Sequence, residues 1–114
     1  MVLAGASMPL DSSQRKYLRG LAHALKPVVE LGKSGLTPAT VTAIAAALAR
    51  HELIKVRLVG TRADKLAQAD RIAAETSSEL VGLVGHVGTF YRESPEEKRR
   101  RIRVPPARQR AGAS

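Results

Sequence analysis

The strongest constraint on the fold is the alternation of apolar and polar residues over the segment 53–59. Successive side chains of a β-strand point to opposite faces, so a period of two predicts a strand with one apolar and one basic face. The apolar face would hold Ile54, Val56 and Leu58, and the basic face would hold Lys55 and Arg57. This segment therefore belongs in a sheet that is covered on one side.

Two helices are predicted before this strand. Asp11 and Gln14 resemble a capping box, and Pro27 ends the helix that they open. Thr37-Pro38 marks the start of the second helix, which is expected to run to about Arg50. In the first helix, Tyr17, Leu18, Leu21, Ala22 and Leu25 share one face and Arg15, Arg19, His23 and Lys26 share another. In the second helix, the inward stripe is Val41, Ile44, Ala45 and Leu48, and the far side carries the small residues Ala39, Ala43 and Ala46.

A third helix and three further strands complete the pattern. The helix is expected at about Arg62–Glu75, with Leu66, Ala69 and Ala73 inward. The strands are expected at Val28–Leu31, Glu79–Val84 and Thr89–Arg92. The short connection Gly85–Gly88 predicts an antiparallel hairpin. The order α-β-α-β-α-β-β indicates an α/β (α+β) fold with one mixed sheet and helices packed on it.

The chain of 114 residues has room for one domain. Residues 1–9 are predicted to be a disordered leader, residues 10–92 the folded domain, and the Pro- and Arg-rich residues 93–114 a solvated, flexible tail. The absence of cysteine excludes disulfides and thiolate zinc sites, and it fits a cytoplasmic location. No apolar run approaches the ~20 residues of a membrane-spanning helix, so no membrane association is expected.

The charge balance favours a polyanionic partner. Nineteen Lys+Arg against ten Asp+Glu give a formal net charge of +9. Each phosphate that a cation neutralises releases condensed counterions, although an anionic membrane surface would attract the same charge. The tail has seven basic and three acidic residues, so a charge of +5 remains on the body of the chain. The predicted folded part is therefore basic in its own right.

The motif Gly32-Lys33-Ser34-Gly35 lies between a predicted strand and a predicted helix and resembles part of a phosphate-binding loop. A Walker A motif needs another glycine where this chain has Pro27, and no carboxylate follows the second strand to bind magnesium, so nucleotide hydrolysis is not expected. Two glycines would let the backbone approach a sugar-phosphate chain, as in KH modules, while Lys33, Ser34 and the helix N-terminus add positive charge and donors. A plain strand-to-helix turn would explain the same four residues.

No catalytic, cofactor or metal-binding set is recognised in the sequence. His23, His51 and His86 are widely separated and lack a carboxylate pattern, so no metal site is expected. Phe90 and Tyr91 alternate on the last strand, so one ring is expected inside and one outside. An outward ring could stack on a base or simply cover the edge of the sheet.

Three blocks of the sequence carry a family resemblance, namely QRKYLRGLAHALKPVVELGKSGLTPATV, ALARHELIKVRL and ELVGLVGHVGTFYR. Together they resemble the CRM domain (chloroplast RNA splicing and ribosome maturation), and more closely its stand-alone bacterial YhbY-type members. The resemblance runs from about Leu10 to Arg92. It implies a four-stranded mixed sheet similar to the C-terminal domain of translation initiation factor three, RNA binding with the GxxG loop as a main contact, and association with precursors of the large ribosomal subunit. Arg15, Arg19 and Lys26 match the positive surface of the family, whereas the arginine-rich tail departs from its compact form.

The leading hypothesis is a monomeric, non-enzymatic protein that binds ribosomal RNA or pre-ribosomal particles. The candidate RNA-binding residues are Gly32, Lys33, Ser34, Gly35, Arg15, Arg19, Lys26, Lys55, Arg57 and Arg62. Lys55 and Arg57 can contribute only if their face of the sheet is open. The alternative hypothesis is a protein-interaction adaptor that uses the alanine-rich face of the second helix. Salt distinguishes the two, because phosphate contacts weaken with salt and apolar docking does not.

Overall fold

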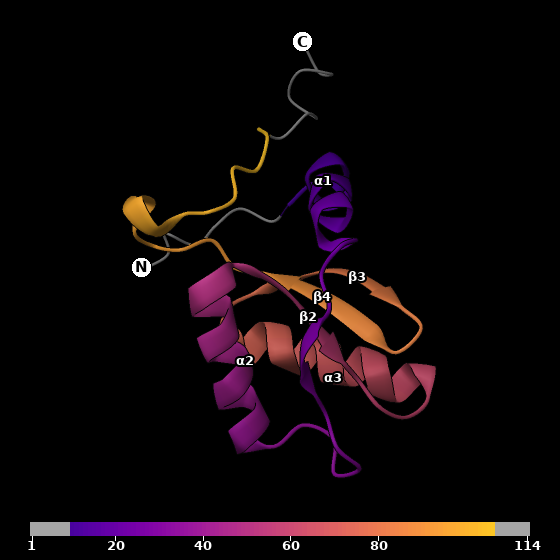
Figure 1. Ribbon diagram of the computed structural model, residues 1–114. Helices are drawn as coiled ribbons and strands as arrows, with labels where there is room; N and C mark the ends of the chain where they lie inside the picture. Colours follow the sequence, from indigo (N-terminus) through magenta and orange to yellow (C-terminus); the bar gives the residue numbers. More distant parts are fainter. Residues whose placement is uncertain (1–9, 107–114) are drawn as a thin grey trace.

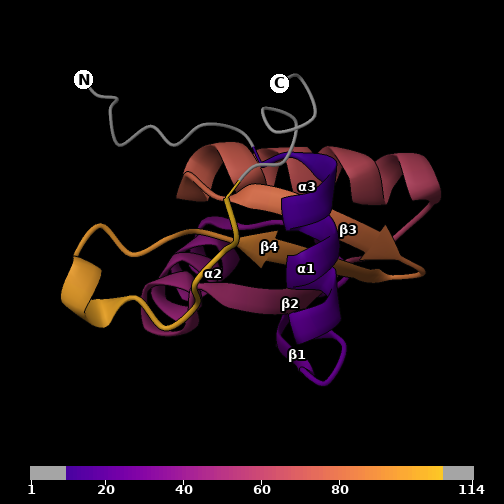
Figure 2. The same ribbon diagram turned by 90° about the horizontal axis from the view of Figure 1, so that it is seen from above.

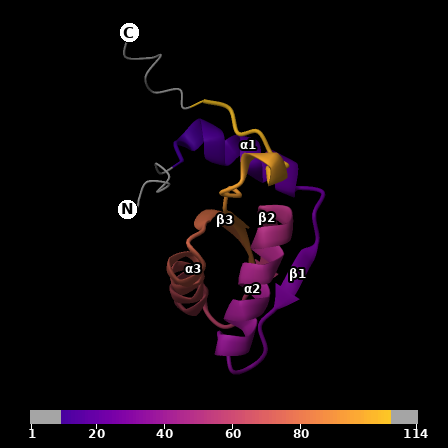
Figure 3. The same cartoon turned by 90° about the vertical axis from the view of Figure 1, so that its left-hand side faces the viewer.

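The computed structural model describes residues 10–106, which form three layers around one sheet (Figures 1 and 3). Helix α1 covers one face of the sheet, and α2 and α3 cover the other. The elements are α1 (Ser12–Ala22), β1 (Pro27–Glu30), α2 (Pro38–His51), β2 (Leu53–Arg57), α3 (Arg62–Thr76), β3 (Glu79–Val84), β4 (Val87–Tyr91) and a short 3-10 helix, η1 (Glu97–Arg99). The predicted α-β-α-β-α-β-β order is confirmed. No helix among these residues combines the length and apolar character needed to cross a bilayer.

The four strands form one mixed sheet in the order β1-β2-β4-β3. Strands β1 and β2 are parallel and joined through α2, whereas β4 is antiparallel to both β2 and β3. In this register Lys55 lies opposite Thr89, and Leu53 lies opposite Tyr91. The mixed sheet and the β3–β4 hairpin are therefore as the sequence predicts, but β4 begins at Val87 and not at Thr89, so only Gly85 and His86 form the connection.

Each of the three α-helices begins with a capping box, in which two side chains satisfy backbone N–H groups at the helix start. The pairs are Asp11 with Gln14, Thr37 with Thr40, and Thr61 with Asp64. The predicted starts of α1 and α2 are thus confirmed, and Pro38 occupies the first turn of α2, where it costs no hydrogen bond.

Two apolar clusters hold the layers together. The larger lies between the sheet and α2 and α3, and its buried residues are Leu31, Ile44, Leu48, Ile54, Val56, Leu58, Ala69, Ile72 and Phe90. The smaller lies on the α1 face, and its buried residues are Leu18, Ala22, Leu53, Val81 and Tyr91. The predicted alternation in β2 is confirmed, because Ile54, Val56 and Leu58 enter the larger cluster while Leu53 faces α1.

The first helix is shorter than predicted. It ends at Ala22, and hydrogen bonds from the N–H of His23 to Gly20 and from the N–H of Leu25 to Ala22 close the turns that follow. Lys26 is therefore outside the helix. The predicted inward face was too wide, since only Leu18 and Ala22 are buried while Tyr17, Leu21 and Leu25 stay about 40% exposed.

The inward face of α3 was also predicted incorrectly in part. Leu66 is 39% exposed, whereas Ile72 is fully buried and Lys65 is only 8% exposed. The Nζ of Lys65 donates a 2.9 Å hydrogen bond to the carbonyl of Gly85, in the turn of the β3–β4 hairpin. A lysine can take such a position because its stem packs against apolar groups while its amine reaches an acceptor.

Phe90 and Tyr91 lie on opposite faces of β4, but both rings are buried, at 0% and 6% exposure. Phe90 enters the larger cluster and Tyr91 the smaller one. The prediction of one outward ring is wrong because both faces of β4 are covered, so neither ring is available for stacking on a base.

The hydroxyl of Tyr91 is buried without a hydrogen-bond partner among the described residues. Burial, with smaller contributions from Glu93 and Glu52, raises the pKa of this phenol well above its ordinary value. An unpaired buried hydroxyl is destabilising by about 1 kcal/mol or more, so Tyr91→Phe should raise the free energy of unfolding by about 1 kcal/mol. Urea denaturation at pH 7 measures this, with Tyr17→Phe at an exposed ring as the control. A loss of stability in Tyr91→Phe would show that the hydroxyl has a partner after all.

Residues 93–106, here named the strap, differ from the expected solvated tail. The strap lies on the α1 side of the sheet (Figures 1 and 2), where Ile102 and Val104 pack against the smaller cluster. The side chain of Gln14 donates a 2.8 Å hydrogen bond to the carbonyl of Pro105. The predicted leader and the last eight residues of the tail lie outside the described residues.

Glu52 anchors the strap from within the fold. This residue follows α2, has a positive φ of 64° and is only 1% exposed. Its carboxylate accepts hydrogen bonds from the backbone N–H groups of Ser94 at 2.6 Å, Arg101 at 2.7 Å and Ile102 at 3.0 Å. The three hydrogen bonds offset the free-energy cost of burying the Glu52 carboxylate. Because Ser94 precedes η1 while Arg101 and Ile102 follow it, they fix the strap on both sides of this helix.

Candidate functional site

The motif Gly32–Gly35 forms a tight turn at the end of β1. The N–H of Gly35 donates a 2.9 Å hydrogen bond to the carbonyl of Gly32, and Gly35 has a positive φ of 74°. Lys33 and Ser34 occupy the two central positions and are exposed. Neither of their N–H groups donates a hydrogen bond within residues 10–106. The turn therefore presents two backbone donors, a hydroxyl and an ammonium group to solvent.

Apolar residues fix the turn on both sides. Leu31 is 5% exposed, and its N–H donates to the carbonyl of Arg57 at 2.9 Å, which extends the β1–β2 pairing up to the motif. Leu36 follows the turn and packs against the larger cluster. Thr37 then caps α2, whose N-terminus adds a partial positive charge beside the turn. Rigid flanks hold the exposed tip in one place, at the end of α2 farthest from α1 (Figure 1).

A shallow groove of about 680 Å³ separates the turn from the start of α3. Gln68 fixes its far wall, since the side-chain amide exchanges hydrogen bonds of 3.1 and 2.9 Å with the backbone of Val59. The lining residues are Leu31, Gly32, Lys33, Ser34, Gly35, Val59, Gly60, Asp64 and Gln68. The groove thus combines an apolar part with backbone and amide groups.

Asp64 is the acidic residue in this lining. A hydrogen bond from the N–H of Thr61, and a second contribution from the Thr61 hydroxyl, lower the pKa of Asp64, so the carboxylate is ionised at neutral pH. A phosphate is repelled on that side and attracted on the other, by Lys33. The groove next to Asp64 consequently suits an uncharged group of a ligand better than a phosphate.

The fold requires glycine at one end of the turn, Gly35, but not at the other, Gly32. Gly35 has a positive φ, where a side chain is strained, whereas Gly32 does not, and a Cβ at Gly32 would have no atom within 4 Å. We predict that Gly35→Ala lowers the free energy of unfolding by about 1 kcal/mol and that Gly32→Ala leaves it unchanged. Chemical denaturation of both variants measures this. Equal losses would contradict the geometry.

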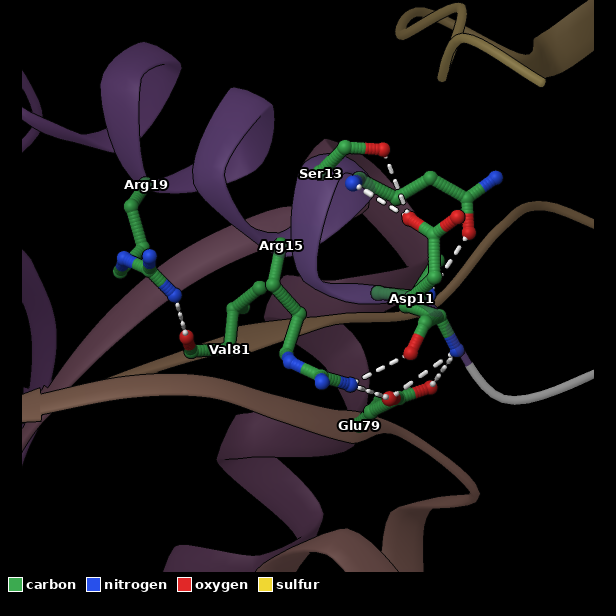
Figure 4. Close-up of polar contacts among 8 residues, drawn as sticks. Asp11, Ser13, Arg15, Arg19, Glu79 and Val81 are labelled. Carbon is green, nitrogen blue, oxygen red and sulfur yellow. Dashed lines mark hydrogen bonds and ion pairs between the residues drawn. The ribbon is translucent and has the colours of Figure 1, made fainter. Parts of the chain in front are cut away.

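Arg15 and Arg19 do not lie beside the turn. Both point from α1 onto β3 on the opposite face of the sheet (Figure 4). Arg15 forms a 3.4 Å ion pair with Glu79 and donates to the carbonyl of Leu10, while Arg19 donates a 3.0 Å hydrogen bond to the carbonyl of Val81. These contacts attach α1 to β3. The structure thus gives both arginines a structural role that the sequence did not indicate.

The remaining predicted residues fall into separate places. Lys55 and Arg57 share the α1 face of β2. Arg57 is exposed, and its Nε lies 3.9 Å from the Oε2 of Glu30. Lys26 is exposed between α1 and β1. Arg62, the first residue of α3, starts an element that borders the groove. Arg57 ends β2 beside the turn, because its carbonyl accepts the N–H of Leu31. The structure therefore brings Gly32–Gly35, Arg57 and the start of α3 together, and it places the other basic residues elsewhere.

Sequence reasoning missed several residues that hold the elements of the fold together. Arg92 donates hydrogen bonds to the carbonyls of Thr76 at 2.9 Å and Ala45 at 3.4 Å, so it links the C-terminal end of α3 to the middle of α2. Gln68 and Glu52 were missed too, because single polar residues in a helix or at a helix end carry no periodic signal. The strap did carry a periodic signal, because basic and apolar residues alternate over Arg101, Ile102, Arg103 and Val104.

The histidines do not form a site. His23 follows α1, His51 ends α2, and His86 lies in the β3–β4 turn, 3.4 Å from the Nζ of Lys65. Over residues 10–106, no cluster of three or more His, Asp, Glu or Cys side chains has an arrangement that could hold a metal ion.

Comparison with known proteins agrees with this architecture. The model of the CRS1/YhbY (CRM) domain matches residues 10–92. The chain belongs to the CRM domain family. A Haemophilus influenzae relative named "RNA-binding protein" is 43% identical over 90 residues, which is 78% of this chain and 91% of the relative. A Bacillus subtilis relative named "Probable RNA-binding protein YqeI" is 36% identical over 78% of this chain and 94% of the relative.

A solved structure shows the same CRM fold. It is the solution structure of a hypothetical Staphylococcus aureus protein, described as a candidate RNA-binding protein. It superimposes with a TM-score of 0.75 at 36% identity and covers 85% of this chain and 100% of that chain. The matched region of the CRM domain ends at residue 92, so the strap lies beyond it, whereas its anchor Glu52 lies within it.

Proposed function

We propose that this CRM-domain protein binds RNA through the turn Gly32–Gly35, without catalysing a reaction. The relatives named as RNA-binding proteins and the +9 charge of the chain support an RNA partner. The turn supplies the groups that would contact the RNA. A phosphate placed over it would accept hydrogen bonds from the free N–H groups of Lys33 and Ser34 and lie beside the Lys33 ammonium.

The observation that carries this proposal is the open space around Gly32. The fold itself does not need glycine there, because neither φ nor neighbouring atoms exclude a side chain. A bare backbone at an exposed, cationic turn is what close approach of a sugar-phosphate chain requires. Gly32→Ala should therefore weaken RNA binding while the free energy of unfolding stays the same.

The groove beside the turn complements the phosphate contact. A phosphate held by Lys33 leaves the attached ribose or base free to lie against Leu31, Val59 and the backbone of Gly60. Backbone contacts of this kind fix the position of the RNA but do not read its sequence. Selectivity would then come from the shape of the RNA.

We further propose that the RNA is a precursor of large-subunit ribosomal RNA, as the CRM resemblance implies. Filter binding of the full chain to transcripts of large-subunit RNA, small-subunit RNA and transfer RNA tests this, with sedimentation of tagged protein in cell extracts as a second measurement. We expect tightest binding to the large-subunit transcript and co-sedimentation with large-subunit precursors. Equal affinity for all transcripts would contradict the ribosomal assignment, and no binding to any would contradict RNA binding itself.

A further inference from the structure

Helix α2 connects the turn to the strap anchor. The turn precedes Pro38 at one end of the helix, and Glu52 follows His51 at the other. Figure 3 shows the strap beyond the C-terminal end of α2 and the β1–α2 connection beyond its N-terminal end. With 14 residues, α2 spans about 21 Å at 1.5 Å per residue. The two features therefore lie at opposite ends of one rigid element.

The exposed side of α2 between them would not repel a polyanion. Its residues Ala39, Ala43 and Ala46 are exposed, as the sequence predicts, and their side chains are small and uncharged. No aspartate or glutamate occurs anywhere in α2, and its last turn carries Arg50 and His51. Small side chains also let another molecule approach the helix closely.

The strap presents cations at the far end of this path. Its residues alternate, so Ile102 and Val104 pack on the smaller cluster while Arg101 and Arg103 stay exposed. Arg99 pairs with Glu96 at 2.8 Å and Arg100 with Glu93 at 3.7 Å.

Three strap cations remain available for a partner. Within residues 10–106, the side chains of Lys98, Arg101 and Arg103 have no ion pair. The hydrogen bonds from the N–H groups of Arg101 and Ile102 to Glu52 fix this part of the backbone. Because the backbone is held, the cations lose less conformational freedom on binding than they would in a flexible tail.

We propose that the strap is a second phosphate-binding surface, held in place by Glu52, and that bound RNA runs along α2 from the turn to the strap. This inference rests on the proposed function of the turn. It names the surface formed by Lys98, Arg101 and Arg103 as the contact for a second stretch of the same sugar-phosphate chain. An RNA ligand must therefore reach across about 21 Å, the length of α2.

The double variant Arg101→Gln/Arg103→Gln tests the strap and keeps Ile102 and Val104 in place. The control is Lys16→Gln/Arg71→Gln, which removes the same charge from exposed positions on α1 and α3. The probe is a hairpin RNA with a single-stranded extension of about 20 nucleotides, titrated from 0.05 to 0.5 M salt. We expect the strap variant to bind about 5- to 25-fold more weakly at 0.1 M salt and to lower the log–log salt slope by about 1.4, at 0.7 per lost phosphate contact. The control should stay close to the wild type.

The proposal would be overturned if the strap variant bound the RNA probe with the same affinity and the same log–log salt slope as the wild type. The proposed function of the turn would survive that result as long as the wild type binds the probe and a charge reversal at Lys33 and Ser34 abolishes binding. A wild type that binds no RNA would instead refute the proposed function.

Hydrogen exchange gives a second readout on the unmodified chain. Addition of the RNA probe should slow amide exchange at residues 33–34 and 98–104 together and leave residues 70–75 of α3 unaffected. Protection of residues 33–34 alone would overturn the assignment of the strap.

Discussion

Lys33→Asp/Ser34→Asp is expected to weaken RNA binding by roughly 100-fold or more. The double substitution removes one cation and places two carboxylates where a phosphate would sit. Each new carboxylate repels a phosphate about 5 Å away by about 1–2 kcal/mol at the surface, and the lost ammonium adds about 1 kcal/mol. Filter binding at 0.1 M salt measures the change.

The same substitutions should not unfold the protein. Both side chains are exposed and form no hydrogen bond or ion pair among the described residues, and aspartate is favourable next to the N-terminus of α2. Thermal denaturation should therefore give an unchanged or slightly higher midpoint. A matched control is Ser12→Asp/Lys16→Asp, which changes the net charge equally on α1, across the sheet from the turn. Comparable losses of affinity in both variants would mean that overall charge, and not the turn, governs binding.

Much of the fold is predictable because its signals are local. The capping boxes at Asp11 and Thr37 and the alternation in β2 each follow from residues close together in the chain. The turn Gly32–Gly35 was identified for the same reason. Its two glycines and the helix start at Thr37 are adjacent in sequence, and the structure places them at one exposed corner.

The sequence could not show which cations are already engaged. Arg15 and Arg19 share a basic face of α1, which by itself suggests a solvated binding surface. Their partners, Glu79 and the carbonyl of Val81, lie more than sixty positions away in β3. Such pairs depend on the packing of α1 across the sheet, so charge periodicity alone could not show that these arginines also attach α1 to β3, and their RNA-binding role stays a prediction.

Glu52→Ala is expected to lower the free energy of unfolding by about 3 kcal/mol. The carboxylate is 1% exposed, and its removal leaves the N–H groups of Ser94, Arg101 and Ile102 without their acceptor. Hydrogen bonds to a charged group contribute about 1.5–3 kcal/mol each, but release of the strap would return the N–H groups to water and limit the loss. A change of 3 kcal/mol corresponds to a melting temperature lower by more than about 10 °C.

A series at this position separates the carboxylate from the backbone. Glu52 has a positive φ of 64°, so Glu52→Gly should be less destabilising than Glu52→Ala by about 1 kcal/mol, since glycine removes the strain and the alanine does not. Glu52→Gln keeps one carbonyl acceptor for Arg101 and Ile102 but places an amide donor opposite the N–H of Ser94. Its free energy of unfolding should therefore lie between those of the wild type and Glu52→Ala. If Glu52→Ala instead unfolds at the wild-type midpoint while the amides of Ser94 and Arg101 exchange faster, the strap is a locally docked segment that adds nothing to global stability. In that event the cations of the strap would keep their charge but be held less firmly, because only the packing of Ile102 and Val104 and the hydrogen bond from Gln14 to Pro105 would still hold the strap against α1.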